Sequence, residues 1–206
     1  MRVGAESVIS VIRWRGRELI RKQRLPKAYR RPEIDERIRR SRTLHEARVI
    51  KTLSENGVPV PVIFFLDIAG SSIYMQRIVG AELRERLDKN NILLAERLGM
   101  IAGLTHKLSI SHGDLTLSNI MVGVDNGLWL IDFGLSFFNA TLEEMAVDVH
   151  LLERSVESTL PWLRMNFMEK FYDGYRDVLG REMTGRILAK VSEIRRRGRY
   201  VERTVR

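Results

Sequence analysis

The sequence predicts an α+β protein of two lobes, a small β-rich lobe followed by a mostly helical one. Its 206 residues, 44% of them hydrophobic and 30% charged, are sufficient for a packed interior. Short β-branched segments occur before residue 77, whereas helical patterns dominate after residue 80. We therefore expect residues 1–78 to form the first lobe and residues 79–206 the second.

The first lobe is expected to run strand, strand, helix, strand, strand. Two β-branched segments are joined across Arg15-Gly16-Arg17, which predicts a hairpin. The long helix should end at Gly57, because Pro59 and Pro61 forbid its continuation. In chain order, the five expected elements are Ser7–Trp14, Glu18–Arg24, Ile34–Asn56, Val62–Asp67 and Ser72–Gln76.

The second lobe is expected to hold five helices and one strand-rich stretch. The apolar residues of the helical segments recur at spacings of three and four, while residues 120–132 are short apolar runs with a turn between them. The expected helices are Glu82–Leu87, Leu93–Leu108, Glu143–Ser155, Pro161–Leu179 and Glu182–Arg197.

The charge distribution indicates either an anionic partner or a surface adapted to heat or salt. Thirty-five Lys and Arg residues against 26 Asp and Glu give a net charge of +9. The excess is concentrated in residues 1–51 and 191–206, which suits an anion-binding face but also an Arg-rich surface adapted to heat or salt. The chain contains no cysteine, which excludes disulfides and a Cys nucleophile. With no signal-peptide or membrane-spanning pattern, we expect a cytoplasmic protein with no membrane partner.

The densest chemical signal is Ser111–Asn119 (SHGDLTLSN), followed by Ile131-Asp132-Phe133-Gly134. Phosphoryl transfer needs a carboxylate that orients the attacking group, and Asp114 suits that task. It also needs oxygen ligands for Mg²⁺, a task that suits Asn119 and Asp132, because a hairpin between them would return the chain. The alternative is that these side chains only cap turns.

Together, in this order and spacing, these two motifs resemble the catalytic and metal-binding loops of a minimal, bilobal protein-kinase-like fold. Such a fold needs a small-lobe Lys for the nucleotide phosphates and a helical Glu that holds it. Lys22 lies on the second expected strand, with Arg21 and Lys27 as competitors. Glu46 is the Glu candidate, because it lies on the apolar stripe of the long helix, where a carboxylate requires a cation.

The nucleotide loop and hinge are weaker assignments. Only Gly4-Ala5-Glu6-Ser7 stands where a longer Gly-rich loop over the phosphates is expected. Met75, Gln76 and Ile78 leave the last small-lobe strand and would form the hinge that binds adenine. Gly113 stands where many protein kinases carry an Arg, and no Ala-Pro-Glu follows, which places transfer to peptides in doubt.

The strings IRKQRLPKAYRRPEID (residues 20–35), RTLHEAR (42–48), SHGDLTLSN, IDFGLS and RRRGR (195–199) make the resemblance specific. They are similar to the small PRPK-type atypical kinases of the KEOPS complex. The resemblance implies ATP and Mg²⁺ as cofactors, weak Ser/Thr kinase or ATPase activity, and support of threonylcarbamoyladenosine synthesis on tRNA. It also implies three partners: a Kae-type threonylcarbamoyl transferase, a small Cgi-type subunit and tRNA.

Position by position, the resemblance implies a Lys22–Glu46 ion pair, Asp114 as the catalytic carboxylate, and Asn119 and Asp132 as metal ligands. Asp148 would brace the catalytic loop. The basic tail of about residues 195–206 would engage tRNA, through charge that can neutralise several phosphates, although a solvated, frayed terminus would look the same. Its cations are Arg195, Arg196, Arg197, Arg199, Arg203 and Arg206.

Two other functions fit part of the pattern. A RIO-type kinase or a small-molecule phosphotransferase of the aminoglycoside type would share an HGD-like loop, although the PKxYRxP string argues against both. A catalytically idle kinase fold that binds tRNA or serves as a scaffold is the non-enzyme alternative. The intact set Lys22, Asp114, Asn119 and Asp132 argues against it.

Overall fold

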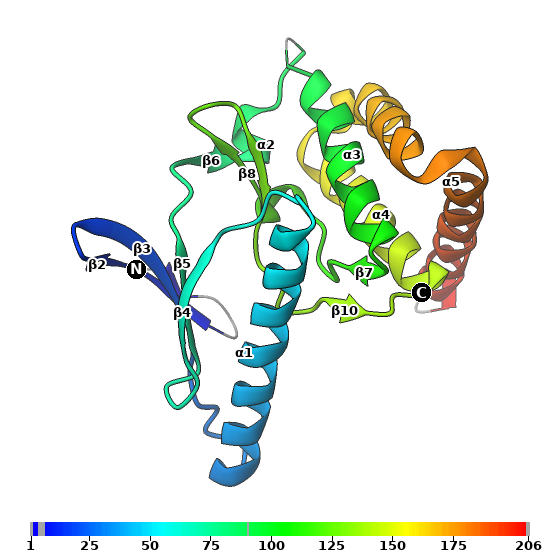
Figure 1. Cartoon of the computed structure of the whole chain (residues 1–206). Helices are drawn as coiled ribbons and strands as arrows, with labels where there is room; N and C mark the ends of the chain where they lie inside the picture. The colour runs from blue at the N-terminus through cyan, green and yellow to red at the C-terminus, as the bar shows by residue number, and fades with distance from the viewer. Residues whose placement is uncertain (1, 4–6, 90, 205–206) are drawn as a thin grey trace. The chain divides into compact units, whose positions relative to one another are not determined.

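The computed structural model describes residues 2–3, 7–89 and 91–204, with only the backbone of residues 2–3 and 198–204. The chain divides into two compact units (Figure 1). The first unit comprises Met1–Val79 and Asp132–Gly134, and the second comprises Gly80–Ile131 and Leu135–Arg206. The short segment Asp132–Gly134 therefore belongs with the first unit, although it lies far along the sequence.

The first unit is an antiparallel sheet covered on one face by a long helix, as Figure 1 shows. The strand order is β1-β2-β3-β5-β4, and helix α1 packs against β4 and β5. Ala47 of the helix packs with Ile73 and Met75 of β5 in a buried apolar cluster. The element bounds are β1 Arg2–Val3, β2 Ser7–Trp14, β3 Arg17–Arg24, α1 Pro32–Glu55, β4 Ile63–Asp67 and β5 Ser72–Gln76.

The expected strand-strand-helix-strand-strand order is found from β2 to β5, but a short strand that was not expected, β1, precedes it. Two element boundaries also differ. The hairpin turn has only two residues, Arg15 and Gly16, both with positive φ, so that β3 begins one residue early at Arg17. Positive φ at both central residues matches the right-handed twist of the strands. Helix α1 begins at Pro32 rather than Ile34, because proline suits the first turn of a helix.

The second unit is mostly helical, as expected, with two small sheets ordered β6-β8-β9 and β10-β7. Strands β6, β7 and β10 lie outside the expected strand-rich stretch. Gly80-Ala81-Glu82 carries no β-branched residue, and β7 and β10 have only two residues each. The bounds are β6 Gly80–Glu82, α2 Leu83–Arg86, α3 Leu93–Lys107, β7 Ile110–Ser111, η1 Leu117–Asn119, β8 Ile120–Gly123, β9 Leu128–Leu130, β10 Phe137–Phe138, α4 Leu142–Thr159, η2 Pro161–Leu163 and α5 Arg164–Thr204.

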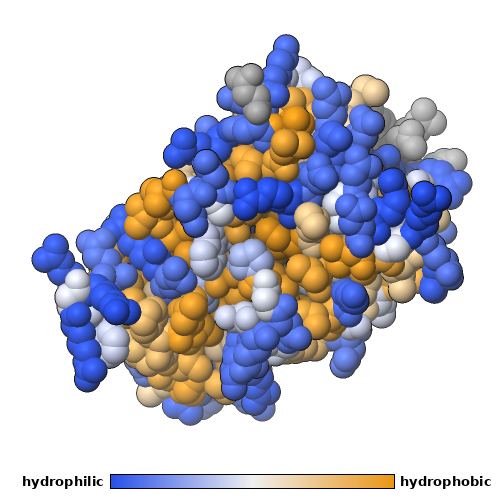
Figure 2. Space-filling model, turned by 45° about the horizontal axis from the view of Figure 1, so that its top comes forward, coloured by the Kyte–Doolittle hydropathy of each residue, from blue (hydrophilic) through white to orange (hydrophobic). Residues whose placement is uncertain are grey.

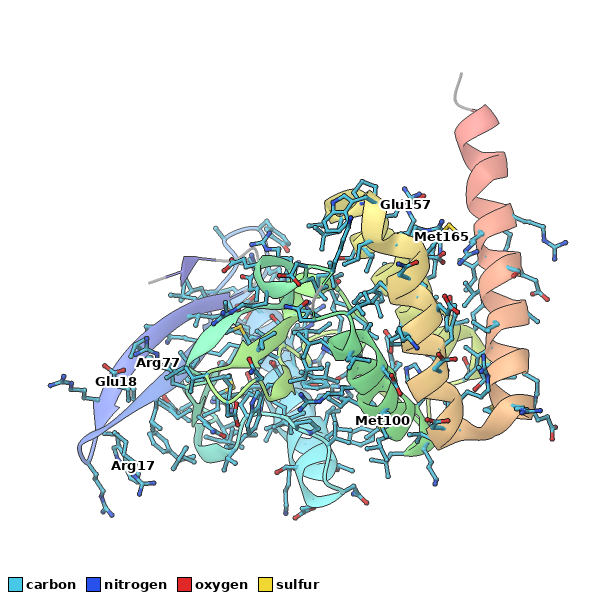
Figure 3. The ribbon with its side chains drawn as sticks, turned by 90° about the horizontal axis from the view of Figure 1, so that it is seen from above. Arg17, Glu18, Arg77, Met100, Glu157 and Met165 are labelled. Carbon is cyan, nitrogen blue, oxygen red and sulfur yellow. The ribbon has the colours of Figure 1, made fainter. Side chains whose placement is uncertain are left out.

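Helices α3 and α4 both pack against α5. Gly99 lets the backbones of α3 and α5 approach closely, because a Cβ there would lie 2.0 Å from the Phe171 carbonyl oxygen. Helix α5 changes direction at Gly180, whose φ of 79° interrupts the helix between the two expected helical segments (Figure 3). Among the described residues, no helix has the length and apolar character needed to cross a bilayer.

Candidate functional site

In the first unit, β3 and α1 bring Lys22 and Glu46 together. Lys22 Nζ donates to Glu46 Oε1 at 2.8 Å, and both side chains are almost completely buried. Burial opposes the charge of Lys22, but the carboxylates of Glu46 and Asp132 outweigh it and raise the pKa of the ammonium group. Lys22 is therefore held as a cation inside the unit.

A second buried cation, Arg24, binds the same carboxylate. Arg24 Nη2 donates to Glu46 Oε2 at 2.7 Å, so that each oxygen of Glu46 accepts from a different cation. Sequence reasoning missed this residue because it sought a single partner for Glu46. The signal was strand alternation, which places residues 22 and 24 on one face and Arg21 on the other, where its guanidinium lies over the Tyr74 ring. Arg21 is thereby removed as a competitor of Lys22.

Asp132 is the third acidic member of this cluster. Lys22 Nζ donates to Asp132 Oδ1 at 2.7 Å, and the Gly134 amide donates to the same oxygen at 3.2 Å. Asp132 has a positive φ of 66°, an uncommon backbone conformation that Asp tolerates better than most residues. Its side chain is 44% exposed, so one end of an otherwise buried cluster is open to solvent.

In the second unit, the loop before β8 brings Asp114 and Asn119 together. Asn119 Nδ2 donates to the Asp114 carbonyl oxygen at 2.9 Å and to Asp114 Oδ2 at 2.8 Å. The Ile131 amide donates to the Asn119 carbonyl oxygen at 2.9 Å, as the expected hairpin of β8 and β9 requires. The amide nitrogen thus fixes the carboxylate, and the amide oxygen of Asn119 is the atom that can bind a cation.

Asp148 on α4 holds this loop through hydrogen bonds to its backbone amides. Its oxygens accept from the backbone amides of His112 at 2.6 Å and Gly113 at 2.8 Å, and the carboxylate is fully buried. Gly113 has a φ of 81°, and a Cβ there would lie 1.9 Å from the Leu135 carbonyl oxygen. No side chain fits at Gly113, which explains the absence of the Arg found there in many protein kinases.

The ring of His112 also has a defined tautomer. Its Nδ1 accepts from the Asp114 amide at 3.3 Å, so Nε2 carries the proton and donates to the Ile131 carbonyl oxygen at 3.1 Å. His106 adds a further buried link, with Nε2 3.1 Å from Asp148 Oδ2 and Nδ1 2.5 Å from the Tyr175 hydroxyl oxygen. The loop that carries Asp114 is therefore held by Asp148 and by the hydrogen bond of His112 to Ile131.

The predicted nucleotide loop and hinge are only partly described. Gly4, Ala5 and Glu6 lie outside the described residues, whereas Ser7 begins β2 and pairs in register with Arg24. Met75 and Gln76 end β5, and the Gln76 amide donates to the Val62 carbonyl oxygen at 2.8 Å. Ile78 follows in the segment after β5.

The arginines of the basic tail differ in their partners. Arg195 pairs with the buried Glu153, and Arg197 pairs with Glu143, both on α4. Arg196 lines a shallow hollow beside Glu193. The side chains of Arg199 and Arg203, and all of Arg206, lie outside the described part of the chain.

Each unit supplies one oxygen donor of a kind that Mg²⁺ accepts. Within the described residues, no group of three or more His, Cys, Asp or Glu side chains gathers to hold a metal. Mg²⁺ is usually held by one or two protein oxygens together with substrate phosphates. The carboxylate of Asp132 and the amide oxygen of Asn119 are donors of that kind.

Comparison with known proteins shows the family to which the chain belongs. The model of the RIO domain matches residues 15–172, so the chain belongs to the RIO-domain family. The structure titled Rio2 kinase-ADP/Mg²⁺-phosphoaspartate complex, from Chaetomium thermophilum, matches this chain with a TM-score of 0.68 at 17% identity. That match covers 93% of this chain and 69% of the other. At 17% identity, the match shows the fold and nothing more about chemistry. The protein-kinase-like fold expected from the sequence is confirmed.

Closer relatives identify the branch of the family. The KEOPS complex subunit Bud32 of Pyrococcus abyssi is 39% identical over 91% of this chain and 86% of its own length. A probable serine/threonine-protein kinase BUD32 homolog of Archaeoglobus fulgidus is 33% identical over 98% of this chain. The chain therefore belongs to the Bud32 family, as its sequence strings indicated. The RIO-type assignment and the Bud32 assignment are not alternatives. The RIO-domain match covers residues 15–172, which include the PKxYRxP string.

Some relatives are much longer. The probable bifunctional tRNA threonylcarbamoyladenosine biosynthesis protein of Methanobrevibacter smithii is 37% identical over 96% of this chain. This chain spans only 36% of that protein. The match therefore covers one part of a bifunctional protein.

Proposed function

We propose that this protein is an ATP- and Mg²⁺-dependent atypical serine/threonine kinase or ATPase. It would act as a subunit of a KEOPS complex that supports threonylcarbamoyladenosine modification of tRNA. The observation that carries the proposal is Lys22, a buried cation held by Glu46 and shared with the partly exposed Asp132. A buried lysine that is paired with a solvent-facing carboxylate can bind a phosphate group in place of that carboxylate.

Each residue of the site has a distinct role in this proposal. Lys22 binds the nucleotide phosphates, and Glu46 keeps the ammonium group in place. Asp132 and Asn119 hold Mg²⁺, which supplies charge neutralisation to the phosphates when bound. Asp114, oriented by the Asn119 amide, accepts the proton of the attacking hydroxyl or water.

The two units correspond in this proposal to kinase lobes, residues 1–78 and 79–206. Adenine would bind at the hinge formed by Met75, Gln76 and Ile78. The loop Gly4-Ala5-Glu6-Ser7 would cover the phosphates. Support comes from β3, which pairs with β5 at the hinge end and with β2 at Ser7, and so connects both parts of the nucleotide site.

Exposed apolar side chains support a role inside an assembly. Trp162 is 58% exposed and Met165, labelled in Figure 3, is 80% exposed. Apolar patches interrupt the hydrophilic surface in Figure 2, and such patches often mark protein interfaces. We propose a Kae-type threonylcarbamoyl transferase and a small Cgi-type subunit as the protein partners.

The basic tail would contact tRNA. Arg196 is the strongest candidate among the described tail residues, because Arg195 and Arg197 pair with glutamates of α4. Arg199, Arg203 and Arg206 would extend the same basic surface. Binding through phosphates should weaken steeply with salt.

The direct test is release of radiolabelled γ-phosphate from ATP by the full chain, with and without the transferase partner and tRNA. Asp132→Ala should abolish release, whereas Asp125→Ala, in the exposed β8–β9 turn, should behave as wild type. Unchanged release by Asp132→Ala would overturn the site. Bound ATP with no release under any condition would instead favour a nucleotide-binding scaffold.

A further inference from the structure

Arg24 carries more hydrogen-bonding capacity than the structure uses. Its side chain is 4% exposed, and Nη2 is committed to Glu46. Nε and Nη1 are buried and have no hydrogen-bond partner among the described residues. Burying unsatisfied donors costs free energy, especially on a charged group, so an acceptor at this position would stabilise Arg24.

The strand register shows where that acceptor would come from. Along β3, Leu19 pairs with Gln76 at the proposed adenine end, and Arg24 pairs with Ser7 at the proposed phosphate loop. Lys22 lies between them. Since a strand rises about 3.3 Å per residue, Arg24 lies about 7 Å beyond Lys22 in the direction away from the adenine end.

Gly134 brings the backbone close to both cations. A Cβ built on Gly134 would lie 3.4 Å from Arg24 Nη2 and 3.9 Å from Lys22 Nζ. The same position lies 3.2 Å from Asp132 Oδ1, the carboxylate oxygen that already binds Lys22. An anionic oxygen, Asp132 Oδ1, therefore already lies at this position next to both cations.

From these observations we infer that Arg24 is a second phosphate-binding residue, which receives the terminal phosphate of the nucleotide while Lys22 binds the phosphates before it. The inference rests on the proposed function, because it assigns a role within the same nucleotide site. The planar guanidinium suits this task, since it can bind Glu46 with one nitrogen and a phosphoryl oxygen with others.

The test compares ATP and adenosine binding by calorimetry in the presence of Mg²⁺. Arg24→Gln should lower ATP affinity about tenfold or more and leave adenosine affinity unchanged. Arg24→Lys, which keeps a cation beside Glu46 if the Gln variant fails to fold, should show the same selective loss. Arg21→Gln, on the opposite face of β3, is the matched control and should bind both as wild type does.

The outcomes separate this inference from the proposed function. An unchanged ratio of ATP to adenosine affinity in a folded Arg24 variant would overturn the inference and leave Arg24 as a structural partner of Glu46. Equal losses for ATP and adenosine would do the same. A wild-type chain that binds neither ligand would overturn the proposed function and this inference together.

Discussion

Two buried glutamates, one in each unit, are each bound by two cations. Glu153 on α4 accepts from Arg164 at 2.5 Å and from Arg195. Both arginine side chains are about one-third exposed. This cluster ties the C-terminal half of α5 to α4 and has a structural role.

Glu46 has the same local chemistry in a different setting. Its cations, Lys22 and Arg24, are each 4% exposed, and Lys22 also binds Asp132. Arg24 retains buried donors without partners in the described residues. Arg164 of the Glu153 cluster also has one buried donor, Nε, without a partner in the described residues, but its side chain is 34% exposed. The two clusters therefore differ in the burial of their cations and in the contact of Lys22 with the partly exposed Asp132.

The largest effect should follow from Glu46→Gln. Removing this carboxylate leaves two buried cations without their shared partner, which should lower the free energy of unfolding by about 3–5 kcal/mol. Urea unfolding of the variant and wild type measures the difference. A loss of under about 1 kcal/mol would show that solvent reaches this cluster.

Asp148→Asn tests a third buried carboxylate, whose partners are mainly backbone amides. The amide side chain can no longer accept from both His112 and Gly113 with full charge. A displaced loop should slow ATP turnover by about 100-fold with little change in ATP affinity. An equal loss of affinity and turnover would indicate general unfolding instead of loop displacement.

Glu153→Gln should have a smaller effect on stability than Glu46→Gln. Because its arginines are partly solvated, the loss should be about 1 kcal/mol or less, and ATP turnover should not change. Urea unfolding in parallel with the Glu46 variant tests this order. Equal destabilisation of the two variants would contradict the claim that the Glu46 cluster is the more strongly buried of the two.

The smallest effect concerns Tyr172, which lies near Arg164 of the Glu153 cluster. Burial raises the pKa of Tyr172 to about 12, against the opposing charge of Arg164. Because the folded state favours the protonated phenol, this contribution is present below the ordinary pKa of 10.0 and is lost as pH rises toward about 12. Unfolding midpoints of Tyr172→Phe should therefore fall less over this range than those of wild type, with the exposed Tyr29→Phe as control. Identical pH profiles for Tyr172→Phe and wild type would contradict this assignment.

Much of the fold and part of the site could be predicted from the sequence. Lys22 and Glu46 could be paired because a carboxylate on an apolar helical stripe requires a cation. Arg24 could also have been predicted, because residues two apart on a strand lie on the same face, which places Arg24 beside Lys22. The pairing of Arg195 with Glu153 depends on the reversal of α5 at Gly180, and long-range packing of that kind leaves no local pattern.

The most direct test of the difference between the two clusters is the shift in melting temperature caused by Mg²⁺ and ATP. We expect the nucleotide to raise the melting temperatures of wild type and Glu153→Gln by the same amount and to leave that of Glu46→Gln, compared with the same variant without ligand, unchanged. An undiminished shift in Glu46→Gln, or its loss in Glu153→Gln, would contradict the assignment of the nucleotide site to the Glu46 cluster.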